Sequence, residues 1–339
     1  MIGYILRRLV FLVIICFGIT LITFFISHVI PGDPARLVAG PGADKAQILA
    51  IKHHFGLDLP INEQYVRYID NIFHGDLGTS IVTRNDVASE ITRRLPATLE
   101  LVFVSFILYL LIGLSLAVLA ATTRLKAVDV AVRTLSIAAY AIPAFVLALW
   151  LQLTFYFHLG WLPAGGRLSV LSTPPHKITG FFLIDSVLDG RWDALRDSAQ
   201  HLALPVAALT FGLLAIAVRL TRATLLAELE KDYVKMARLK GLSERAIIRR
   251  HVLRNALVPS LALFGIQFGY LVGGTVVIET IFSWPGLGAY AFESIAALDF
   301  APVMGVTLVV TAIFVSVNFL IDLLYPIVDP RIRLWGRTQ

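Results

Sequence analysis

Charged residues and cysteine are both scarce in this chain. Only 15% of its 339 residues are charged, whereas a soluble domain carries about 25%. The mean hydropathy is correspondingly high, at +0.78. Cys16 is the single cysteine, which excludes an intramolecular disulfide and a cysteine-based metal site. So little polar surface excludes an ordinary soluble protein of this length.

Motifs of the common catalytic sites are also missing. No lysine is followed by Ser or Thr, so there is no Walker A loop and we do not expect this chain to hydrolyse ATP. H-E-x-x-H and G-x-S-x-G are absent as well. His53, His54 and His74 lie in one polar segment, but adjacent histidines point to different faces of a helix. We therefore expect solvated histidines, with no catalytic residue, metal or cofactor in this chain.

What the chain has in abundance is long apolar runs. A helix of about 20 apolar residues crosses the hydrocarbon core of a bilayer. Six runs approach or exceed that length, at residues 9–29, 98–121, 135–159, 201–218, 257–282 and 303–328. The first is too long for a secretory signal, and no small-residue cleavage site follows it. We predict an all-α integral membrane protein with six transmembrane helices.

The charge of the connecting segments gives the chain an orientation. Residues 1–8, 122–133, 219–255 and 329–339 together hold 18 Lys and Arg against 6 Asp and Glu. The alternate segments, 31–95, 161–200 and 283–301, hold 11 against 14. Positive charge favours the cytoplasmic side, so both termini are expected there. Topology then accounts for the +6 net charge without invoking nucleic acid.

The outer segments differ in their expected structure. Apolar positions recur at helical spacing in residues 46–55 and 62–73, which predicts a small helical cap after the first span. The second outer loop is rich in Pro and Gly and is expected to be irregular, with a short helix near 193–200. We divide the chain into a first helix with its cap (1–96), a core of five expected spans (97–328) and a tail (329–339).

Polar side chains inside the expected spans are candidates for a translocation path, because desolvating them is costly. They are Gln152, Gln267, Glu279 and Asn318, with Asp322 near an inner end. For Glu279 and Asp322, an interfacial position or a hydrogen bond to a neighbouring helix is an alternative. Spacing by four residues also places Gly265, Gly269 and Gly273 on one flat helix face, which suits packing, a subunit contact or a pore.

The basic inner loop, residues 219–255, is the most informative segment. Within 232–241 a short helix is expected with Tyr233, Met236, Ala237 and Lys240 on one face. Gly241 is placed to end it in a left-handed cap, and Ser243 to begin a second helix over 244–255. The result is a projecting elbow. Physical reasoning leaves two interpretations open, an amphipathic linker at the membrane surface or a docking knob for a cytoplasmic partner.

This loop resembles the E-A-A-x-x-x-G signature of ABC-importer permeases, in the version carried by the dipeptide/oligopeptide/nickel permease family. The first Glu and Ala of the general signature are replaced by Lys235 and Met236, as the peptide branch also shows. Further stretches similar to that branch are 6–9, 30–34, 74–80, 95–101, 279–288 and 329–333. The matching loop residues are Asp232, Tyr233, Ala237, Arg238, Lys240, Gly241, Leu242, Ser243, His251, Leu253, Arg254, Asn255, Ala256 and Pro259.

The resemblance implies a type I ABC-importer permease fold, in the first of two paralogous subunits of a bacterial inner-membrane importer. It implies a heterodimer with the second permease, two cytoplasmic ATPases that bind ATP and Mg, and an extracytoplasmic substrate-binding protein. Small peptides are the expected substrate, with glutathione, nickel complexes or another small solute as alternatives. The residues implied in ATPase coupling are Asp232, Tyr233, Met236, Ala237, Arg238, Lys240, Gly241, Arg254 and Asn255.

Two other classes of protein compete with this interpretation. An ion-coupled secondary transporter is often built from internal repeats with broken helices at the midplane, and no repeat is visible in this sequence. An intramembrane enzyme would need a catalytic set, which the sequence lacks.

Overall fold

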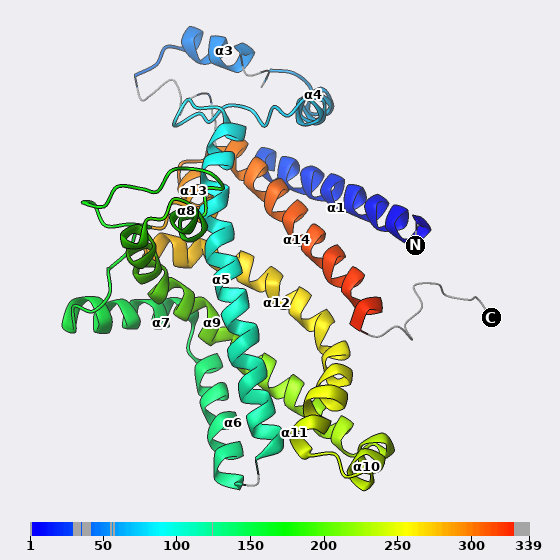
Figure 1. Cartoon of the computed structure of the whole chain (residues 1–339). Coiled ribbons are helices and arrows are strands. Elements are labelled where there is room, and N and C mark those ends of the chain that lie inside the picture. Colours follow the sequence, from blue (N-terminus) through cyan, green and yellow to red (C-terminus); the bar gives the residue numbers. More distant parts are fainter. Residues whose placement is uncertain are drawn as a thin grey trace.

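The computed structural model describes residues 2–29, 35, 42–54, 56, 58–123 and 125–328. In that part of the chain the regular elements are helices, apart from one β-bridge between Thr79 and Asp86 (Figure 1). The tail at 329–339 and the stretch at 30–34 lie outside the described residues, so the expectations made for them are not addressed.

Five helices of the described chain are long and apolar enough to cross a membrane. Each contains one of the expected runs, to within one residue at the end of α12, so five of the six spans are confirmed as helices of spanning length. Several begin earlier than the apolar run because a polar first turn precedes it; Asp86, for example, caps α5 by accepting from Ser89 N at 2.7 Å. The five are α1 (Ile2–Val29), α5 (Val87–Thr122), α9 (Trp192–Leu229), α12 (Leu253–Ile281) and α14 (Phe300–Val328).

The remaining run, 135–159, was predicted to form one continuous spanning helix. That prediction is wrong, because the run is divided between two helices. α6 (Lys126–Ala141) stops before Pro143, and a separate apolar helix follows as α7 (Ala144–Leu151) and the π-helical η1 (Gln152–His158). Proline lacks an N–H and disfavours helical geometry in the residue before it. Ile142 is accordingly extended, with φ −86° and ψ 120°.

The core lies among α5, α7, α9 and α12. α5 and α9 lie side by side, and Leu101, Leu209 and Phe268 belong to one buried apolar cluster between these helices. α1 pairs with α14 (Figure 1), and Arg8 Nη2 lies 2.5 Å from Asp322 Oδ2. Asp322 therefore bonds to a neighbouring helix, which was the alternative to a role in the path.

The connecting helices gather at two opposite ends of the bundle (Figure 1). One end carries α3 (Lys45–His54) and α4 (Ile61–Phe73), which confirm the two helices expected for the cap, although Phe55 is not among the described residues. α8 (Phe182–Leu188) and α13 (Leu287–Ala296) lie toward the same end and were not expected. The other end carries α10 (Asp232–Leu239) and α11 (Glu244–Ile247).

The helix expected near 193–200 is the beginning of α9, not a separate element. Asp193 lies in the first turn of α9. Pro205 falls inside the same helix, which continues without a break to Leu229. The end of the outer loop and the fourth span therefore form one continuous helix of 38 residues.

Candidate functional site

The turn after α10 has the geometry that its sequence predicts. Gly241 has φ +78°, a left-handed conformation that glycine adopts without steric cost. The Leu242 N–H donates to Ala237 O at 3.2 Å, and the Gly241 N–H donates to Arg238 O at 2.9 Å. This pair of bonds is the Schellman motif, which satisfies the last carbonyls of the helix and reverses the chain. The predicted left-handed cap is confirmed.

The second arm of the elbow begins at Ser243. Its Oγ accepts from Ala246 N at 3.4 Å and caps α11. The chain then passes through a π-helical turn, η2 (Ile248–Val252), and continues directly into α12. A displacement of the elbow is therefore transmitted to a spanning helix without an intervening loop.

α10 has an inward and an outward face. Val234 is fully buried and Ala237 is 8% exposed. Met236 and Leu239 point away from the protein, with 54% and 81% of their surfaces exposed. The inward face packs on Ala117, Leu225, Ile247, Val252 and Ala256.

The helical spacing placed Met236 and Ala237 on one face, but the structure separates them. The small side chain of Ala237 allows α10 to approach the chain's own helices closely. The exposed apolar side chains of α10 are instead Met236 and Leu239.

An ion pair and two side-chain hydrogen bonds hold the elbow in place. Arg238 Nε lies 2.7 Å from Glu244 Oε1, so an ion pair spans the turn from α10 to α11. Tyr233 Oη donates to Glu228 Oε2 at 2.7 Å and also bonds to Asn255, linking α9, α10 and α12. Burial raises the pKa of Tyr233, and the bond to Glu228 acts in the same direction. The elbow is thus fixed to the two helices that it joins.

The remaining residues expected in coupling lie at the surface. Asp232 pairs with Lys235 at 2.8 Å, and this hydrogen bond lowers the pKa of the Asp232 carboxyl. Lys240, the C-cap residue of α10, is exposed, and so is Arg254. The elbow therefore has an apolar tip surrounded by charged side chains, which suits docking into a complementary groove.

Glu279 lies fully buried at the far end of α12. Its Oε1 accepts from Thr98 Oγ1 at 2.7 Å, and its Oε2 accepts from Ala289 N at 2.9 Å. Thr98 Oγ1 in turn accepts from Leu287 N at 2.7 Å. A side chain at Gly286 would overlap the Glu279 carboxylate. This cluster fastens the α12–α13 turn to α5, which favours the alternative that Glu279 bonds to neighbouring helices.

Two further buried contacts hold the outer segments to α5, and sequence reasoning missed both. Trp284 Nε1 donates to Ala97 O at 2.9 Å. Arg167 Nη2 lies 2.5 Å from Glu100 Oε2, with its guanidinium 3.7 Å from the centre of the Phe182 ring. The two hydrogen-bonded pairs, Arg167 with Glu100 and Trp284 with Ala97, are each 67 or more residues apart, so no local pattern could reveal them. The available signal was that 95–101 and 279–288 both resembled the same family.

The other three path candidates lie on three different helices, η1, α12 and α14. Gln152 Nε2 donates to Ala164 O at 2.7 Å, and Asn318 Nδ2 donates to Phe314 O at 2.9 Å. Gln267 is 2% exposed, and its Oε1 has no partner among the described residues. A role in the path remains a prediction for these residues.

The glycine face of α12 packs on α14. A Cβ at Gly265 would overlap Asn318, and one at Gly269 would overlap the ring of Phe314. Gly273 has open space around it. Helix packing within this chain therefore accounts for two of the three glycines.

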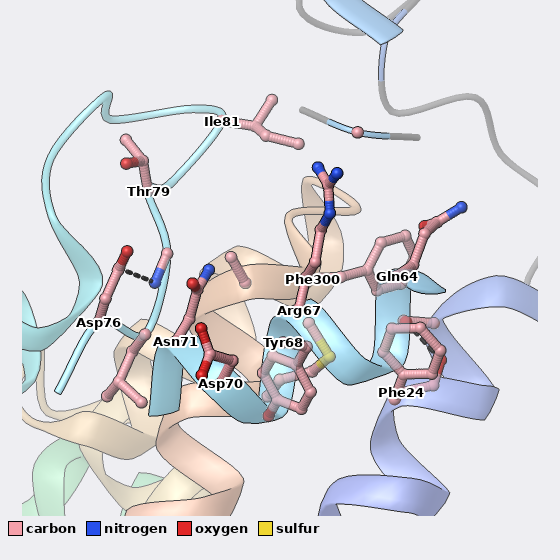
Figure 2. Close-up of a pocket in the computed structure, with 16 residues that line it drawn as sticks. Phe24, Gln64, Arg67, Tyr68, Asp70, Asn71, Asp76, Thr79, Ile81 and Phe300 are labelled. Carbon is pink, nitrogen blue, oxygen red and sulfur yellow. Dashed lines mark hydrogen bonds between the residues drawn. The ribbon is translucent and has the colours of Figure 1, made fainter. Parts of the chain in front are cut away.

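A cavity of about 570 Å³ opens beside the cap. Figure 2 shows Phe24 of α1, Arg67 of α4, Asp76 of the following turn and Phe300 of α14 around it. Side chains of both charges line it, so it suits a polar or zwitterionic surface. Across the described residues, no three His, Cys, Asp or Glu side chains form a metal-binding group, and His74 lies against Asp70 O.

Long apolar helices joined to a capped, projecting elbow define this chain as a multi-span helical membrane protein. A family model described as binding-protein-dependent transport system inner membrane component matches residues 110–334, and the model for the N-terminal part of such components matches residues 1–102. The chain belongs to this family and is an integral inner-membrane protein. Members of this family work with ATPase and substrate-binding partners.

Curated relatives match almost the whole chain. A probable D,D-dipeptide transport system permease protein of Escherichia coli (strain K12) is 46% identical over 325 residues, covering 96% of each chain. A di/tripeptide transport system permease protein of Pseudomonas aeruginosa is 41% identical, covering 98% of this chain and 99% of its own. The membrane fold is similar to an inward-facing structure of the MetNI methionine ABC transporter, with TM-score 0.52, 21% identity, and coverage of 70% of this chain and 96% of that one.

Proposed function

We propose that this chain is a transmembrane subunit of an ATP-driven importer that moves small peptides into the cytoplasm. The observation that carries the substrate class is the 46% identity over 96% of the chain to a permease named for D,D-dipeptides. The 41% identity to a di/tripeptide permease supports the same class. This subunit performs no bond chemistry, and ATP and Mg bind to its partners.

The elbow formed by α10 and α11 couples this subunit to an ATPase. Its exposed apolar tip, Met236 and Leu239, supports docking into a groove on that partner. Because α11 continues through η2 into α12, movement of the groove rotates a spanning helix. In this proposal Gly241 sets the turn, and Arg238 with Glu244 keeps its two arms together.

The chain crosses the membrane six times, with both termini in the cytoplasm. The third crossing is built from α6 followed by α7 and η1, which the break at Pro143 separates. The ion pair between Arg8 and Asp322 supports placing the two termini on one side, because it joins the beginning of α1 to the last turns of α14. The excess of Lys and Arg in the segments on that side favours the cytoplasm. The cap of α3 and α4 is then extracytoplasmic.

The division of the chain follows from this arrangement. Residues 1–96 form the first helix and cap, residues 97–328 form the permease core with the coupling loop 219–255, and residues 329–339 form a cytoplasmic tail. The cavity beside the cap, with Arg67 and Asp76 in its lining, supports docking of the substrate-binding protein at this end. The second paralogous permease completes the path, which Gln152, Gln267 and Asn318 would line.

Uptake of a labelled dipeptide tests the function. Cells that express the complete transporter should accumulate the peptide when the ion gradient is collapsed but not when ATP is depleted. The purified complex should hydrolyse ATP faster when peptide-loaded binding protein is added. Uptake that follows the ion gradient would contradict the proposal and favour a secondary transporter.

A further inference from the structure

A second cavity lies between α6 and α9, on the half of the bundle that carries the elbow. Its volume is about 400 Å³, and it is separate from the elbow and from the cap. The lining residues are Arg133, Ser136, Ile137, Tyr140, Ala215, Ile216, Val218, Arg219 and Arg222.

The lining of this cavity changes in character along the helices. α6 leaves the inner end of the bundle and α9 returns to it, so the two helices run in opposite directions. On α6, Arg133 comes first and Tyr140 lies two turns deeper; on α9, Ile216 lies deeper and Arg219 and Arg222 follow toward the inner end. One end of the cavity is thus cationic and the other is apolar and aromatic.

The cationic end has more guanidinium groups than carboxylates. Arg222 binds Asp129 through two nitrogens, Nε to Oδ1 at 2.7 Å and Nη2 to Oδ2 at 2.8 Å. Arg133 Nη2 lies 3.4 Å from the same carboxylate. Arg219 has no hydrogen bond or ion pair with the part of the chain that the structure describes, and it is exposed. The single carboxylate orients Arg222 and leaves two positive charges uncompensated.

We propose that this cavity binds the headgroup of an anionic phospholipid of the cytoplasmic leaflet. Arginine recognises phosphate oxygens through paired N–H groups, and basic pockets between helices on this side suit anionic headgroups. The acyl chains lie along Ile137, Tyr140 and Ile216, of which Ile137 and Tyr140 are 64% and 59% exposed. The graded lining fits an amphiphile, whereas a free phosphate would leave the apolar half of the cavity unfilled.

The bound lipid has a structural consequence for α6. Only six residues of α6 follow Leu135 before the helix ends at Ala141, and much of its outer side is exposed. A phosphate held by Arg219 of α9 and Arg133 of α6 joins the two helices at the membrane surface. The lipid therefore stabilises the broken third crossing against the fourth.

Native mass spectrometry of the full-length chain, purified in detergent with the subunits that copurify, tests this site. The probes are phosphatidylglycerol, phosphatidylcholine with the same acyl chains, and inorganic phosphate. The wild type should retain one phosphatidylglycerol molecule roughly tenfold more tightly than phosphatidylcholine, and Arg219→Ala should weaken that binding roughly fivefold. Arg249→Ala is the matched control, because Arg249 is exposed at the same end of the bundle but outside the cavity.

A second variant separates the lipid from a free anion. Ala215→Trp fills the apolar half of the cavity and leaves all three arginines in place. It should abolish retention of phosphatidylglycerol. Equal weakening by Arg249→Ala, equal affinity for the two lipids, or unchanged lipid retention in Ala215→Trp would each overturn the proposal. So would phosphate that displaces the lipid completely at millimolar concentration.

Discussion

Thr98 and Glu279, 181 residues apart in the sequence, share a hydrogen bond of 2.7 Å in the buried interior. Thr98 donates to the carboxylate of Glu279 and accepts from the N–H of Leu287, which begins α13. One hydroxyl thus joins α5, α12 and α13. These hydrogen bonds hold the turn between α12 and α13. Gly286 and Gly288 in this turn have no side chain, which leaves room for the Glu279 carboxylate beside them.

Glu279→Ala should strongly destabilise the protein. It removes the acceptor for the Thr98 hydroxyl and the Ala289 N–H, and each buried unpaired group costs about 1–3 kcal/mol. We expect the free energy of unfolding to fall by about 2–4 kcal/mol. Thermal unfolding of the purified protein in detergent measures the loss.

The matched control for that change is Glu293→Ala. Glu293 lies on α13, close to the same turn, but is exposed. We expect a change within about 0.5 kcal/mol, which is usual for a surface position. An equal loss in the two variants would show that the buried bonds of Glu279 do not determine the stability of this turn.

Hydropathy and turn residues were sufficient to predict much of the fold, for a physical reason. A run of about 20 apolar residues has few stable alternatives to a helix in a bilayer, so five spans were predicted correctly. The same measure is insensitive to a single proline, and Pro143 therefore went unnoticed as a helix break. α13 was missed because ten residues between spans are too few for a hydropathy signal.

Gly269→Ala should weaken the contact between α12 and α14. The added methyl group would overlap the ring of Phe314, and such overpacking costs about 1–3 kcal/mol. Gly273→Ala, one turn further along the same helix, meets open space and should be neutral or stabilising by up to about 1 kcal/mol. The pair is compared by thermal unfolding, and equal effects would contradict packing as the role of Gly269.

Asp185 should make the second outer loop sensitive to acid. Burial opposes ionisation, but hydrogen bonds from Thr179, Gly180 and Ile178 outweigh it and lower the pKa of Asp185. Its stabilising effect is therefore fully present above the unfolded-state pKa of about 3.9, and is lost as the pH falls through the lower folded-state value.

Asp185→Asn tests this pH dependence because asparagine does not titrate and turns an NH2 group toward backbone donors. The variant should unfold at a lower temperature than the wild type at pH 7, and the difference should shrink below about pH 4. Asp189→Asn is the comparison, since Asp189 is exposed and accepts from His176 N at 3.1 Å. A gap between wild type and Asp185→Asn that is constant with pH would rule out titration of Asp185 as its cause.

Local sequence patterns predicted the turns of the elbow but not the orientation of its first helix. Gly241 and Ser243 predicted its two caps correctly, because capping depends on neighbouring residues alone. The face of α10 that meets the protein could not be predicted the same way. A helical spacing groups Met236 with Ala237, but which side is covered depends on Leu225 and Ile247 in other elements. Long-range partners of this kind also explain why Arg167 and Glu100 went unrecognised.

Peptide uptake by two glycine variants tests the central claim most directly. Gly241 in the elbow and Gly190 in an outer loop have φ of +78° and +68°, and both have open space around them. Tryptophan at either position therefore imposes a similar local strain on the chain, and only Gly241 lies at the proposed ATPase contact. We predict that Gly241→Trp abolishes uptake at normal membrane abundance, while Gly190→Trp transports peptide as the wild type does. Wild-type uptake by Gly241→Trp, or equal loss in both variants, would contradict coupling through the elbow.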